Sequence, residues 1–156
     1  MNPPPRSLDA FAAVLSSDGP AAALAYLNAG VPHRYSAVYR FEAGLLRNVL
    51  LHDKRDGLRP AFLLAVPFEH SFCQYVRKDQ SFRTDDSGSD ERLLDHPYRG
   101  VVVSYHSVPL SNDLGDLWGT LSHFDMVHHP MPDSEFELLQ QAARLLGSYM
   151  DKPAEV

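Results

Sequence analysis

Apolar residues at helical spacing open the chain. They recur every three or four positions over residues 8–15, and Ser7 stands before them as an N-cap. A second helical pattern covers residues 20–28, where Pro20 fits the first turn. Gly30 is expected to end this helix as a C-cap in the left-handed conformation. The N-terminal third is therefore predicted to hold two short helices.

Strand-like alternation follows in the middle of the chain. Every second side chain is large over residues 35–41, and a turn at 42–44 leads into a second apolar segment at 49–52. This pattern predicts an antiparallel hairpin. Further strands are expected at residues 81–84, 101–110 and 117–125.

The last element is the clearest helix of the chain, at residues 133–150, with Asp133 as its expected N-cap. Two helices, strands, an irregular middle, more strands and a final helix are typical of an α+β domain with an antiparallel sheet. We expect a flexible proline-rich arm at residues 1–6, one domain at 7–151 and a tail at 152–156.

Composition restricts the partners of this domain. The formal charge is −6, which argues against nucleic acid and against an anionic membrane surface as the main partner. No apolar stretch reaches the roughly 18 residues of a membrane span. The single cysteine, Cys73, excludes a disulfide within the chain, and no secretory signal is visible at the start. These features predict a cytoplasmic protein.

Short motifs occur in a fixed order along the second half of the chain. They are Ser71-Phe72-Cys73, Asp85-Asp86, Asp90-Glu91-Arg92, Val108-Pro109-Leu110, Gly119-Thr120-Leu121, Phe124-Asp125 and Pro132-Asp133-Ser134-Glu135. In this order they resemble the GAF domain family, and the resemblance covers residues 8–150. It implies a six-stranded antiparallel sheet with the N- and C-terminal helices on one face. The other face, covered by loops and a short helix, would carry a small-molecule pocket.

The resemblance implies a sensory protein that binds a small molecule and signals to a separate partner, such as a histidine kinase or a regulator. A covalent bilin is not expected, because Gln74 rather than a histidine follows Cys73. A free methionine-(R)-sulfoxide reductase is the first alternative, although one cysteine leaves no resolving thiol within the chain. The sequence contains no nucleophile elbow, P-loop or dinucleotide fingerprint, so nothing in it requires an enzyme.

Eight residues form the expected binding site. The start of a short helix at Ser71 would offer backbone amides to an anion, and several tyrosines predict an apolar pocket with a few hydroxyl groups. The expected ligand is therefore a small anionic or zwitterionic molecule. The predicted ligand-binding residues are Tyr39, Ser71, Phe72, Cys73, Tyr75, Tyr105, Trp118 and His123.

Eight histidines leave two further interpretations open. His123 and Asp125 share one strand face, and His106 is expected on the neighbouring strand, so the three could bind a metal ion or the two histidines a haem. No regular metal-ligand spacing supports the metal, and it is left out of the predicted site. A haem-based gas sensor is the second functional alternative. His128 and His129 are expected to face solvent.

Two apolar stripes run along the terminal helix. Their members are Phe136, Leu139, Ala143, Leu146 and Met150 in one stripe, and Leu138, Ala142, Leu145 and Tyr149 in the other. Together they exceed the arc of about 100° that a surface helix usually buries. Part of the excess should pack on the N-terminal helices, and the rest predicts a symmetric homodimer through the terminal helices.

Overall fold

The fold is seen in a computed structural model of the 156-residue chain. The structure describes residues 6–57, 63, 65–67, 81–93 and 100–151. The predicted helix at 71–76 and the site residues Ser71, Phe72, Cys73 and Tyr75 lie outside this part of the chain.

Two short helices begin the domain, as predicted. Helix α1 spans Leu8–Asp18, and the Ser7 hydroxyl accepts a hydrogen bond from the Ala10 amide at 3.1 Å. Helix α2 spans Pro20–Asn28. The prediction for Gly30 is wrong, because α2 ends in the right-handed conformation and the Gly30 amide bonds back to the Leu27 carbonyl in a tightened last turn.

The final helix, α4, spans Asp133–Met150 and has the predicted bounds. Its N-cap is Pro132, whose extended backbone precedes the first turn and whose carbonyl oxygen receives the first hydrogen bond of the helix. Asp133 is therefore the first helical residue rather than the predicted cap. Its carboxylate still lies where the positive end of the helix dipole favours an acid.

The strands form a six-stranded antiparallel sheet in the order β3-β2-β1-β6-β5-β4. Their bounds are Tyr35–Glu42 for β1, Leu45–Asp53 for β2, Ala65–Pro67 for β3, Phe82–Thr84 for β4, Ser104–Ser111 for β5 and Leu117–Asp125 for β6. Two 3₁₀ turns, η3 at Ser87–Ser89 and η4 at Glu91–Leu93, follow β4. The predicted α+β class and antiparallel sheet are confirmed.

The β1–β2 hairpin turns through two residues, Ala43 and Gly44. Their φ angles are +48° and +82°, the pair of left-handed conformations that a tight two-residue turn requires. Within β1 the side chains alternate as predicted: Tyr35 and Tyr39 face one side of the sheet, and Ser36 and Val38 face the other.

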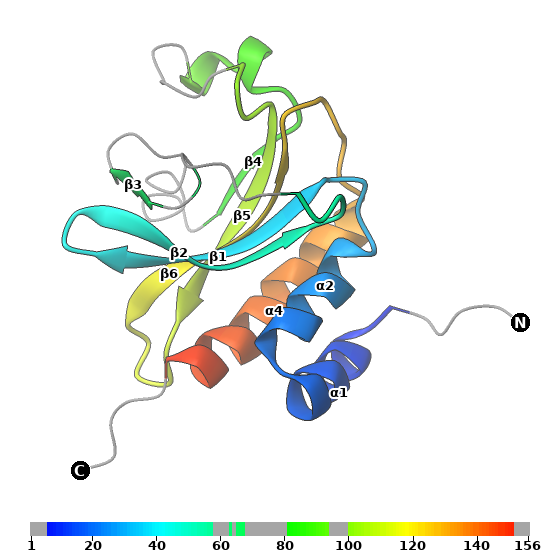
Figure 1. The fold of residues 1–156 in the computed structure, drawn as a ribbon, viewed down its shortest axis with the longest axis vertical. Coiled ribbons are helices and arrows are strands. Elements are labelled where there is room, and N and C mark those ends of the chain that lie inside the picture. The colour runs from blue at the N-terminus through cyan, green and yellow to red at the C-terminus, as the bar shows by residue number, and fades with distance from the viewer. Residues whose placement is uncertain (1–5, 58–62, 64, 68–80, 94–99, 152–156) are drawn as a thin grey trace, which may run out of the picture.

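Helices α1, α2 and α4 lie together on one face of the sheet, while η3 and η4 lie on the other side (Figure 1). We call these the helix face and the open face. Each has its own hydrophobic cluster, the larger one built around Phe11, Leu24, Leu121 and Leu139 on the helix face. The smaller cluster holds Tyr35, Tyr39, Phe82 and Phe124 on the open face. Among the described helices, none combines the length and apolar character that a membrane span requires.

Candidate functional site

Strand register places side chains on the open face in rows that run across the sheet. One row joins Tyr35 on β1, Phe124 on β6 and Tyr105 on β5, each the cross-strand partner of the next. The second row, two residues further along each strand, consists of Ala37, Ser122, Ser107 and Phe82. The third row contains Tyr39, Thr120 and Pro109.

The central side chains of the middle row are small. Ala37, Ser107 and Ser122 are all fully buried, although none of them can reach far above the sheet. Larger side chains stand on either side, with Tyr105 and Phe124 in the first row and Tyr39 in the third. We call this row of short, buried side chains the trough.

Hydroxyl groups line the trough. The Ser107 and Ser122 hydroxyls are 3.0 Å apart, and Ser122 donates to the Tyr105 hydroxyl at 3.5 Å. At the other side, the Tyr39 hydroxyl donates to the Leu63 carbonyl oxygen at 2.8 Å. The floor of the trough is therefore polar at its centre.

Aromatic rings close one side of the trough. Tyr35 stacks on Phe124 with ring centres 5.2 Å apart, and Tyr105 follows at 6.3 Å from Phe124. Phe82 continues the series at 6.2 Å from Tyr105. These contacts hold the rings in fixed positions beside the serine hydroxyls, the mixture of apolar walls and few polar groups that small-molecule sites use.

The predicted site residues are divided between the two faces. Tyr39 and Tyr105 lie on the open face, in the rows on either side of the trough. Trp118 and His123 lie on the helix face, where Trp118 joins the larger cluster and His123 bonds to Ser36. They cannot line the same pocket as the tyrosines, because the sheet itself separates them; this part of the predicted set is corrected.

His123 belongs to a polar network under α2. Its Nδ1 is 2.5 Å from the Ser36 hydroxyl, which also accepts a hydrogen bond from the Asn28 side-chain amide at 2.8 Å. Lys54 in turn donates to the side-chain oxygen of Asn28 at 2.6 Å. The network ties the end of α2 to the centre of the sheet.

Four histidines meet at this end of the helix face; we call His33, His106, His123 and His129 the histidine junction. The His33 ring lies 5.3 Å from His106, 5.3 Å from His129 and 6.4 Å from His123, measured between ring centres. The cross-strand pairing of His106 with His123 agrees with the sequence prediction. His129, expected in solvent, instead contacts the Asp125 carboxylate at 3.1 Å.

Burial keeps the centre of the junction uncharged. Loss of hydration, with smaller repulsion from His106 and His129, lowers the pKa of His33 from 6.5 to about 3. The pKa of His106 is lowered to about 4, mainly by burial and to a smaller extent by repulsion from the nearby Arg83 guanidinium. The pKa of His123 is also well below its ordinary value, chiefly through burial. At neutral pH these three imidazoles are therefore neutral.

The junction does not have the geometry of a metal centre. Within the described residues, no three His, Cys, Asp or Glu side chains are placed so that they could share one ion. The rings of His106 and His129 both meet the His33 ring edge-on, with ring centres 5.3 Å away. The arrangement does not support the predicted alternative of a metal held by His106, His123 and Asp125.

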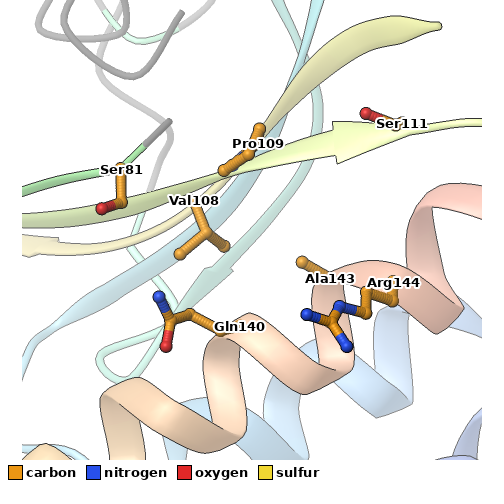
Figure 2. Close-up of a pocket in the computed structure, with 7 residues that line it drawn as sticks. All are labelled: Ser81, Val108, Pro109, Ser111, Gln140, Ala143 and Arg144. Atoms are coloured by element: carbon orange, nitrogen blue, oxygen red, sulfur yellow. The ribbon is translucent and has the colours of Figure 1, made fainter. Parts of the chain in front are cut away.

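A separate cavity of about 390 Å³ lies between β5 and α4. Figure 2 shows Val108 pointing from the strand toward α4, with the Gln140 and Arg144 side chains extending from α4 beside it. Its described lining contains none of the predicted site residues. The cavity lining shares Pro109 with the third row of the open face.

Sequence reasoning missed the small residues of the trough and the central histidine of the junction. Ala37, Ser107 and Ser122 carry no chemical signal by themselves; only the β1–β6–β5 register shows that they are neighbours. The alternation of each strand is the one available hint. His33 lies in an irregular segment between α2 and β1, where no periodic pattern predicts its direction.

Comparison with known proteins agrees with this architecture. A search of curated proteins found no match. One similar solved structure is the free methionine-R-sulfoxide reductase of Neisseria meningitidis in complex with its substrate. The two sequences are 17% identical and the TM-score is 0.70; the match covers 90% of this chain and 83% of the reductase. The GAF domain of an Acinetobacter phosphoenolpyruvate-protein phosphotransferase has 12% identity and a TM-score of 0.70, over 90% and 87%.

A third similar structure is the phycocyanobilin-bound GAF domain of a cyanobacterial phytochrome, with 17% identity, a TM-score of 0.68 and coverage of 90% and 89%. At these identities the likeness concerns the fold. The family model for the GAF domain matches residues 17–150, which is most of the chain. The chain therefore belongs to the GAF domain family.

Proposed function

We propose that this protein is a sensory domain that binds a small anionic or zwitterionic molecule in the trough and passes the signal to a separate partner, such as a histidine kinase or a regulator. The observation that carries the proposal is the row formed by Ala37, Ser122 and Ser107, which is fully buried although its side chains are short. A strip of short polar side chains between an aromatic row and Tyr39 is suited to a small molecule.

The polar groups of the trough indicate the chemistry of the ligand. Ser107, Ser122 and Tyr105 form a chain of hydroxyl groups, each of which can donate or accept a hydrogen bond. Such a chain can turn its donors toward a carboxylate or another anionic group. The rings of Phe124 and Phe82 would contact the apolar part of the molecule.

Tyr39 supports a link between the ligand and Leu63. The Tyr39 hydroxyl donates to the carbonyl oxygen of Leu63, a residue between β2 and β3. A ligand that contacts the Tyr39 hydroxyl would therefore compete with this hydrogen bond.

The first experiment is native mass spectrometry of the purified protein, followed by thermal unfolding with a panel of small carboxylates and zwitterionic amino acids. A ligand that binds only the folded state raises the melting temperature by mass action. Tyr105→Phe removes one hydroxyl and keeps the ring, so we expect affinity to fall about tenfold, the effect of about 1.4 kcal/mol.

Tyr26→Phe is the matched control. Tyr26 lies on the helix side, where its hydroxyl accepts a hydrogen bond from the Ser7 amide at 3.1 Å. The same chemical change there should leave ligand affinity unchanged. Equal losses of affinity in both variants, or binding that Tyr105→Phe leaves intact, would contradict a site in the trough.

The enzyme alternative has its own test. Two similar structures are free methionine-R-sulfoxide reductases. We expect at most a trace of turnover with methionine-R-sulfoxide and a dithiol, because this chain has one cysteine. Robust turnover that disappears in Cys73→Ser would replace the sensory proposal with the reductase. An absorbance band near ~400 nm in the purified protein would instead favour haem.

A further inference from the structure

His33 is buried without hydrogen bonds at the centre of the histidine junction. Its side chain is 0% exposed, and within the described chain neither ring nitrogen has a hydrogen-bond partner. A neutral imidazole always has one donor and one acceptor, so both are unsatisfied whichever tautomer is present. An unsatisfied buried polar group is costly, and natural proteins rarely keep two on one ring without a use for them.

His106 also has a buried ring nitrogen without a hydrogen bond. Its Nε2 lies 3.1 Å from an Asp85 carboxylate oxygen, but at an angle that makes no hydrogen bond. Its Nδ1 receives a long hydrogen bond of 3.4 Å from Arg83. Its ring also contacts Phe136 in the first turn of α4, with ring centres 6.5 Å apart.

The junction lies where the helical layer is joined to the sheet. The connection from α2 to β1 carries His33, and the connection from β6 to α4 carries His129. Figure 1 shows both connections converging at the end of the layer where α4 begins. Separation of the helices from the sheet at this end would admit water to the junction.

Charged groups face the junction from every element around it. They are Arg6 before α1, Lys54 after β2, Arg83 and Asp85 at β4, Asp125 on β6, His129 before α4, and Asp133 and Glu135 in the first turn of α4. Asp133 and Glu135 form ion pairs with Arg83 and Arg6. The remaining carboxylates, Asp85 and Asp125, do not suffice to charge the buried rings.

We propose that the histidine junction is an acid-sensitive latch, which releases the end of α2 and the start of α4 from the sheet as the pH falls below about 6, while the rest of the domain stays folded. The released state is favoured because its hydrated histidines can take up protons, whereas the closed state must keep them neutral. This inference is independent of the ligand proposed for the trough.

The direction of the pH effect follows from linkage. The closed-state pKa values of His33 and His106 lie below the ordinary value of 6.5, so the closed state binds fewer protons than the released state below that pH. The closed state is therefore fully favoured above pH 6.5 and loses its advantage as the pH falls toward 4 and 3. At pH 5 the equilibrium constant for release should rise about thirtyfold for each exposed histidine, and about a thousandfold for the two together.

Release should remain local because the opposite end of the helix face is held by apolar packing. There Trp118 contacts Gly147 in the last turns of α4, and Leu146 belongs to the same apolar cluster. Helix ends open at lower free energy than the middle of a core. The two ends of α4 should therefore respond differently to acid.

Hydrogen exchange tests the latch. Protection factors at pH 7 and pH 5 are compared for residues 28–36 and 129–137, at the junction, and for residues 117–121 and 142–149, at the other end. We expect protection of the junction segments to fall about a thousandfold and that of the other segments to change far less. His33→Gln, which keeps a polar side chain but does not titrate, should reduce the pH effect to about thirtyfold.

His128→Gln is the matched control, because His128 is exposed on the same connection. It should keep the full pH effect. If His33→Gln does not fold at pH 7, His106→Gln replaces it with the same expectation. An equal loss of protection at both ends, constant protection of the junction segments, or an unchanged pH effect in the folded Gln variant would each overturn the proposal.

Discussion

Trp118 donates its indole N–H to the carbonyl oxygen of Gly147 at a distance of 3.1 Å. The Arg40 guanidinium lies over the other side of the ring system, 4.4 Å from a ring centre. The indole is thus enclosed between β6, β1 and the last turns of α4. This contact explains why Trp118 serves the packing of the helices and not the trough.

Trp118→Phe should lower the free energy of unfolding by about 1–2 kcal/mol, because the Gly147 carbonyl loses its donor and the smaller ring leaves space. Trp118→Ala should cost about 3–5 kcal/mol. Urea unfolding measures both. Neither variant should change the affinity of the folded protein for a trough ligand, so a selective loss of affinity in Trp118→Phe would return this residue to the binding site.

Gly147→Ala should destabilise the domain even though alanine favours helices. A Cβ at this position would lie 2.4 Å from the Ser111 carbonyl oxygen, so α4 would have to move away from β5. We expect a loss of about 1–3 kcal/mol in urea unfolding. Gln141→Ala, on the exposed side of α4, is the control and should change stability by less than about 0.5 kcal/mol. A stabilised Gly147→Ala variant would show that α4 and β5 are further apart than described.

Asp53 gives a pH-dependent prediction outside the histidine junction. Hydrogen bonds from the Arg34 side chain lower the pKa of Asp53 from 3.8 to about 2. Burial opposes this shift, and hydrogen bonds from the Arg55 and Gly57 amides add to it. A lowered acid pKa gives stability that is complete above the unfolded value and is lost as the pH falls through the folded value.

Asp53→Asn should therefore lower the free energy of unfolding at pH 7, by about 1 kcal/mol after solvent screening. The difference between the variant and the unmodified protein should persist at pH 5 and shrink between pH 4 and pH 2. Urea midpoints at these pH values provide the measurement. A difference that disappears already between pH 7 and pH 5 would exclude Asp53 as its source.

The homodimer predicted from the apolar stripes of α4 must be tested at the exposed residues of the second stripe. Leu138 and Ala142 are buried within the chain, whereas Leu145 and Tyr149 are 38% and 44% exposed. Leu145 and Tyr149 also border a shallow cavity of about 350 Å³ beside α1. Only this outer half of the second stripe is available for a partner.

We expect the unmodified chain to sediment as a dimer at micromolar concentration, because paired Leu145 and Tyr149 side chains would cover each other's apolar surface. Leu145→Glu should give a folded monomer, and Gln140→Glu, on another side of α4, should stay dimeric. Leu138→Glu should unfold the protein and is not informative. A mass of about 17 kDa for the unmodified chain would contradict the dimer.

The sequence determined the local elements because their causes are local. Helix α2 has its predicted bounds, since Pro20 can begin a helix and the apolar spacing continues to Asn28. Strand β6 also begins and ends where alternation predicted. The order of short motifs was sufficient to identify the family.

The site depended on information that no local pattern contains. Tyr105 and Trp118 look alike in the sequence, as aromatic residues on neighbouring strands, yet one borders the trough and the other faces α4. Which face a side chain occupies depends on the register of its strand, and a shift of one residue would exchange the two.

The histidine junction was even less predictable from local sequence patterns. His33, His106 and His129 come from three segments far apart in the chain, and only packing of α2 and α4 on the sheet brings their rings together. The sequence by itself predicted the fold class, the three long helices and the bounds of β6, through periodicity and turn chemistry, whereas β2 begins at Leu45 rather than at residue 49 and β5 begins at Ser104 rather than at residue 101. The tertiary structure decided which polar groups lose water, because burial is a property of the assembled layers and not of any single segment.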